Sequence, residues 1–124
     1  MRSLMIEIPG LPPRELSLNS RVHWTKKSEA MREAKLGAYL LICQQWRDGQ
    51  IPMRMARISY CFHLKSRRVI DYDNLICRCK PYVDAFELAA VIEGDDVWHL
   101  DIGSVTFILA KVEKTVISIQ ERGE

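Results

Sequence analysis

The 124-residue chain lacks several features that would place it at once in a familiar class. It has no apolar run long enough to span a bilayer, and its first residues lack the basic, apolar and small-residue order of a secretory signal. It also has no glycine-rich phosphate loop and no nucleophile elbow, which argues against those nucleotide-binding and hydrolase classes. We therefore expect a cytoplasmic protein with no membrane partner.

Cysteine is present, but its spacing is not that of a disulfide framework. The four cysteines lie in otherwise apolar or charged segments, and in a cytoplasmic chain we expect reduced thiols (Cys43, Cys61, Cys77 and Cys79). The Cys77-Arg78-Cys79 triplet is a weak zinc signal, because zinc sites space paired cysteines by two to four residues and need a second pair. An EF-hand is also disfavoured, since the required glycine and terminal glutamate are absent at loop spacing.

The net charge of +2 conceals an uneven distribution. Residues 1–70 hold 13 Lys and Arg against 5 Asp and Glu, whereas residues 71–124 hold 5 against 11. Most of the acidic excess lies between positions 71 and 101. A basic half favours an anionic partner such as nucleic acid, and the acidic cluster beside it would repel that partner unless cations neutralise it.

Hydrophobic periodicity predicts strands and helices in the order β-α-β-α-β-β. Strands are expected at 4–8 and 57–65, one helix from about Thr25 to the region of Gly49, and a second from the DYDN segment to Gly94. The segments 104–110 and 115–120 flank a short polar loop and predict a β-hairpin. The interpretation is an α+β fold over residues 1–124, a single compact domain with a mixed four-stranded β-sheet and two main helices.

Paired aspartates are the main chemical signal. Asp71 and Asp73 are two apart after a strand, and in extended chain they would face one side. The pair Asp95-Asp96 can join them only if the chain folds back or the second helix is short. Oxygen ligands of this kind suit Mg²⁺, with Mn²⁺ as a substitute. The alternative is that Asp73 caps a helix and Asp95-Asp96 forms a solvated turn.

Basic residues near these carboxylates are candidates for phosphate contacts. On a helix, one polar stripe would contain four side chains (Asp73, Cys77, Lys80 and Asp84). Pro81 would kink this helix or mark a later start of it. In the segment LNSRVHWTKK, Trp24 either stacks on an unpaired base or fills the core. The residues predicted to contact DNA are Arg67, Arg68, Lys65, Arg78, Arg21, Lys26 and Lys27.

Together these motifs resemble the RusA-like Holliday junction resolvases. The resemblance covers most of the chain, and its most specific parts are DYDNL, KPYVDAF and IEGDD. It implies metal binding by Asp71, Asp73 and one of Asp95 and Asp96, with Asp96 favoured. Lys80 looks like the catalytic lysine of that family, here seven residues after the second aspartate instead of four.

The resemblance implies a Mg²⁺-dependent, structure-selective endonuclease that cuts Holliday junctions as a homodimer. A junction is nearly two-fold symmetric, so two symmetric cuts call for two related sites. Cys77 stands four residues after Asp73, where that family has its lysine, and Ile70 stands directly before Asp71, where the family often has a basic residue. The alternative is a non-catalytic nucleic-acid-binding module whose carboxylates no longer assemble a metal site.

Overall fold

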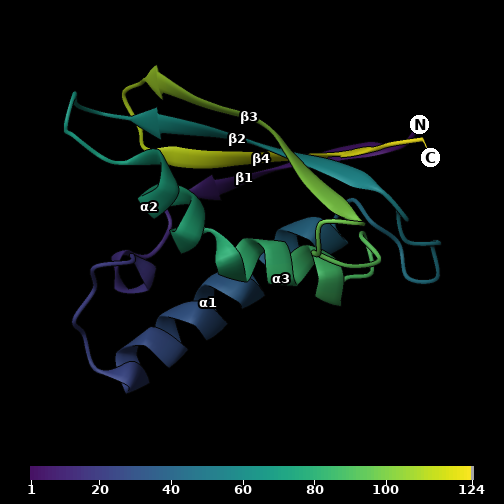
Figure 1. The fold of residues 1–124 in the computed structure, drawn as a ribbon, viewed down its shortest axis with the longest axis horizontal. Helices are drawn as coiled ribbons and strands as arrows, with labels where there is room; N and C mark the ends of the chain where they lie inside the picture. The colour runs from purple at the N-terminus through teal and green to yellow at the C-terminus, as the bar shows by residue number, and fades with distance from the viewer. Residues whose placement is uncertain (124) are drawn as a thin grey trace.

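Four strands form one mixed sheet, and the helices lie against one of its faces (Figure 1). The computed structural model describes residues 1–123, so Glu124, the last residue of the predicted domain, lies outside them. The α+β class, the single compact domain and the mixed four-stranded sheet are confirmed. The elements are β1 (Ser3–Pro9), the 3-10 turn η1 (Arg14–Leu16), α1 (Trp24–Cys43), β2 (Ala56–Leu64), α2 (Tyr72–Arg78), α3 (Lys80–Leu88), β3 (Leu100–Leu109) and β4 (Lys114–Glu121).

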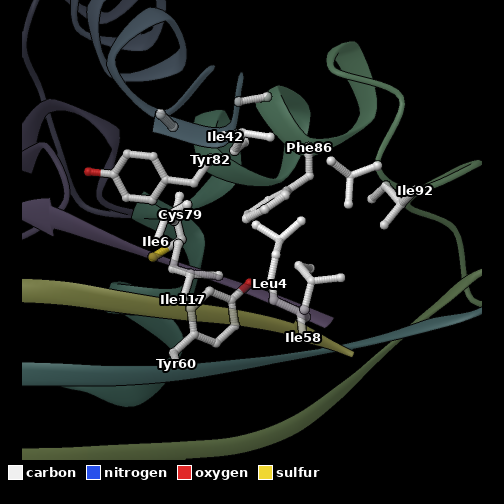
Figure 2. Packing of buried hydrophobic residues seen from close by; sticks show 14 of the residues in the cluster. Leu4, Ile6, Ile42, Ile58, Tyr60, Cys79, Tyr82, Phe86, Ile92 and Ile117 are labelled. Carbon is white, nitrogen blue, oxygen red and sulfur yellow. The ribbon is translucent and has the colours of Figure 1, made fainter. Parts of the chain in front are cut away.

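The core lies between the sheet and helices α1 and α3. Along β1, β2 and β4 alternate residues are buried on the covered face, and register places Ile117 of β4 opposite both Ile6 of β1 and Tyr60 of β2. Figure 2 shows Ile42 of α1 and Phe86 of α3 above these side chains. This burial of large apolar side chains is the main source of stability. Within residues 1–123, no helix is both long and apolar enough to cross a bilayer.

The second predicted helix consists of two consecutive helices, α2 and α3, that meet at Cys79. Pro81 has no N–H to donate to the carbonyl of Cys77, so the helical ladder is interrupted there. The helix also ends at Leu88 instead of continuing to Gly94, and Ala90 adopts a left-handed φ of 58° just beyond it. This early end allows the chain to fold back toward the start of α3.

The predicted hairpin between segments 104–110 and 115–120 is wrong. The strand order is β1-β4-β2-β3, so β2 separates the two strands that are adjacent in sequence. β3 pairs with β2 in parallel, and β4 pairs antiparallel with both β1 and β2. β4 buries alternate residues, as a central strand does, whereas β3 has no fully buried residue and takes the edge. Local patterns indicate both strands but do not specify their partners.

Candidate functional site around helices α2 and α3

The two aspartates of DYDN lie at the start of α2, not at the exit of β2, which ends at Leu64. Asp71 is the extended residue before the helix, and Asp73 is already helical, so the alternation of extended chain does not align their carboxylates. Asp73 accepts a hydrogen bond from the backbone N–H of Asn74 at 2.9 Å. Both aspartates are exposed, and within residues 1–123 neither forms an ion pair with a basic side chain.

Helix α2 is held in place by three side chains from its first turn. Tyr72 packs edge-on against Phe107 of β3, with ring centroids 4.7 Å apart. Asn74 accepts a hydrogen bond from the N–H of Leu18 at 2.9 Å, and Leu75 is fully buried. These contacts fix the position of a seven-residue helix that would be too short to be stable alone.

Lys80 occupies the centre of an ion-pair cluster at the start of α3. Its Nζ lies 2.9 Å from Asp84 and 2.8 Å from Asp95, so the chain folds back to the start of α3. Hydrogen bonds to Asp84 and then to Asp95 raise the pKa of Lys80. The ammonium group therefore stays charged at neutral pH and cannot serve as a general base, although its third N–H can donate to an anion.

Asp96 takes no part in this ion-pair cluster and stabilises the turn before β3. Its carboxylate accepts from the backbone N–H of Trp98 at 2.8 Å and contacts Nδ1 of His99 at 2.8 Å. These two contacts lower the pKa of Asp96. A Cβ at the buried Gly94 would lie 3.0 Å from Oδ2 of Asp96, so the glycine leaves room for this close packing.

The carboxylates do not form a metal site in this arrangement. Among residues 1–123, no three His, Cys, Asp or Glu side chains lie close enough together to hold one ion. Asp95 is engaged by Lys80 and Asp96 by His99, whereas Asp71 and Asp73 lie at the start of α2, a helix about 10 Å long. The oxygen donors match the preference of Mg²⁺, but their positions do not, so the metal ligands stay a prediction.

A groove of about 670 Å³ runs between the helices and β3. Cys77 and Lys80 both line this groove. The lysine therefore lies on the same side as Cys77, although it comes three residues later and the helix is interrupted at Cys79. Tyr60 and Ile102 form apolar walls, and Asp95 and Asp101 supply the acidic part. The predicted polar stripe is therefore partly formed, with Lys80 at its centre. Burial raises the pKa of the Cys79 thiol to about 12, which leaves this neighbour unreactive.

The predicted DNA-contacting residues fall into separate groups. Arg68 and the buried Arg78 line one pocket, and Arg14, which the sequence interpretation missed, lines it too. In the sequence, Arg14 is marked only by its place directly after Pro12 and Pro13. Trp24 is 70% exposed at the start of α1, so a core position for it is wrong. The other candidates are exposed or half-buried, on the 65–71 loop or near the start of α1 (Lys65, Arg67, Arg21, Lys26 and Lys27).

Comparison with known proteins adds one relative. No family model matches the chain. Over 84 residues it is 32% identical to an uncharacterized protein of Xylella fastidiosa strain Temecula1. The matched segment makes up 66% of this chain and 55% of the relative, so the chain spans about half the length of that protein.

Proposed function

We propose that this protein is a structure-selective DNA endonuclease that acts on Holliday or other branched junctions. The observation that carries the proposal is the 2.8 Å contact between Lys80 and Asp95, which brings together two parts of the motif that are 15 residues apart. The resemblance of the DYDNL, KPYVDAF and IEGDD segments to RusA-like resolvases supports the same activity. The basic residues near α2 supply contacts for the phosphate backbone.

The proposed reaction is hydrolysis of a DNA phosphodiester. The oxygen of a water molecule forms a bond to phosphorus, and the bond between phosphorus and one deoxyribose oxygen breaks. The water proton ends on that leaving oxygen or in solvent, which gives one phosphate monoester end and one hydroxyl end. The free N–H of Lys80 would stabilise the negative charge that develops on the phosphate oxygens.

We also propose that the activity depends on Mg²⁺, for which Mn²⁺ can substitute. Lys80, Asp84 and Asp95 together carry two negative charges and one positive charge, so a phosphate would be repelled without a further cation. The ligands proposed from the resemblance are Asp71, Asp73 and one of Asp95 and Asp96. Because the described residues do not converge, metal binding would require Asp95 to leave Lys80 or Asp96 to leave His99.

The proposed assembly is a homodimer. A four-way junction is nearly two-fold symmetric, and two subunits related by a two-fold axis would present two sites to strands of like polarity. Sedimentation of the protein alone and with a synthetic junction gives the subunit number. A monomer in both conditions would contradict this part of the proposal.

The activity is tested with a labelled synthetic four-way junction, a linear duplex of the same sequence, and Mg²⁺ or Mn²⁺. We expect paired nicks near the branch point of the junction and little cutting of the duplex. Asp73→Asn should abolish the nicks, whereas Asp48→Asn, a matched change in the exposed loop after α1, should leave them.

The second candidate is a nucleic-acid-binding module without catalysis. It is favoured by the absence of three converging ligand side chains within residues 1–123. Tight junction binding with no cleavage in either metal would support the module and exclude the endonuclease.

A further inference from the structure

Helix α2 borders a second cavity on the side away from the Lys80 groove. This pocket has a volume of about 480 Å³ and lies between the 11–17 segment, the 65–71 loop and α2. Asn74 and Arg78, which are four residues apart and so share one face of α2, form its helical wall. Arg14 and Arg68 line it from the two loops.

Arg78 is a buried cation in this wall, with only 8% of its surface exposed. Its Nε donates to the carbonyl oxygen of Pro12 at 3.0 Å, and one terminal nitrogen donates to the same oxygen. Burial, followed by the nearby positive charge of Arg14, lowers the pKa of Arg78, but a guanidinium remains protonated at neutral pH. A buried charge normally has an ion-pair partner, since desolvation is costly.

That partner is absent from the part of the chain that the structure describes. Within residues 1–123, neither Arg78 nor Arg14 forms an ion pair with a carboxylate. The single acidic residue that lines the pocket, Glu113, is bound to Arg68 at 2.8 Å and to the N–H of Lys65 at 3.2 Å. Three guanidinium groups against one carboxylate leave a surplus of two positive charges.

We infer that this pocket binds a phosphate group, with Arg14, Arg68 and Arg78 around the anion. A phosphate carries one or two negative charges, which match the surplus, and its oxygens accept the forked N–H donors of arginine. Asn74 and Ser17 add polar groups to the lining. That the phosphate belongs to a DNA strand rests on the proposed function, whereas the phosphate chemistry of the pocket does not.

The first experiment titrates the isotopically labelled protein with inorganic phosphate and follows the Nε–H signal of Arg78 by NMR. Sodium chloride at matched ionic strength serves as the reference. We expect a saturable shift with phosphate alone. Arg14→Gln and Arg68→Gln should each weaken the apparent affinity about tenfold or more, because each removes a charged hydrogen-bond donor. Arg47→Gln, the same change after α1, should stay within about twofold of the parent.

Two results would overturn the inference. One is the absence of a saturable shift beyond that caused by sodium chloride. The other is an equal loss in the Arg47→Gln control. Superposition of the backbone amide spectra verifies that each variant is folded, and neither tested substitution removes the contact between Arg78 and Pro12.

The second experiment identifies the source of the phosphate. Junction binding is measured at several salt concentrations for the parent, the Arg14→Gln and Arg68→Gln variants and their double variant. The slope of the logarithm of the binding constant against the logarithm of the salt concentration reports the number of phosphates contacted. If the pocket holds one phosphate of the strand, each variant reduces the magnitude of this slope by about 1, and the double variant reduces it no further. Unchanged slopes with intact phosphate binding would exclude the DNA source and favour a small phosphate ester. Failure of the parent to bind DNA would refute the proposed function alone.

Discussion

The two sides of helix α2 differ in how their positive charges are compensated. On the groove side, Lys80 is half-exposed and contacts two carboxylates, Asp84 and Asp95. On the pocket side, Arg78 is buried and contacts a carbonyl oxygen, while Arg14 and Arg68 add to the charge around it. A helix of seven residues therefore separates a compensated cation from an uncompensated one.

The difference indicates different uses. A lysine between two carboxylates is stable without a ligand and gains little from an anion until a further cation arrives. A buried guanidinium without a carboxylate lowers the stability of the folded chain, and an anion that binds there would offset that cost. Residues that oppose stability in this way are candidates for function.

Removing the shared support of the two sides should have the largest effect. Leu75 is fully buried on α2, so Leu75→Ala should lower the free energy of unfolding by about 2–5 kcal/mol and should weaken both phosphate binding and cleavage. Urea denaturation measures the change. Leu88→Ala, at a 60% exposed position at the end of α3, should change the free energy by about 0.5 kcal/mol or less. Equal effects would mean that α2 is not anchored by Leu75.

A charge change on the groove side alone should separate chemistry from binding. Lys80→Gln should lower the rate of junction cleavage about 10²–10³-fold, because it removes a cation beside the developing phosphate charge. Junction affinity should fall much less, since the substitution leaves the proposed phosphate contacts of Arg14, Arg68 and Arg78 unchanged. Single-turnover cleavage and fluorescence anisotropy measure the two quantities. Lys111→Gln, in the exposed loop after β3, is the control, and an unchanged cleavage rate for Lys80→Gln would contradict its catalytic role.

The smallest effect on stability should come from Asp96, whose carboxylate accepts hydrogen bonds within the turn before β3. Its pKa lies below the ordinary 3.8, so its contacts stabilise the fold above that value and are lost as pH falls through the lower folded pKa. Asp96→Asn should therefore lower the free energy of unfolding at pH 7, with a difference that shrinks at pH values well below 3.8. Urea denaturation over this pH range checks it, and a difference independent of pH would contradict the assignment.

The sequence was informative where a signal was local. Alternation in β2 predicted its buried face, the charge of the 65–80 segment predicted a polar site, and Pro81 predicted the break that separates α2 from α3. Partners that are distant in the chain were not accessible in this way. Nothing local distinguishes Asp95, which reaches Lys80, from Asp96, which turns to His99, because the choice depends on where α3 ends.

Periodicity and composition act over a few residues, so they were enough to predict the α+β composition, the four strands and the concentration of charge around α2. The position of β2 between β3 and β4, and the meeting of Arg14 with Arg68 and Arg78 around one pocket, depend on long-range packing. Strand order and pocket formation depend on which surfaces pack together, and that competition among long-range contacts leaves no local mark in the chain.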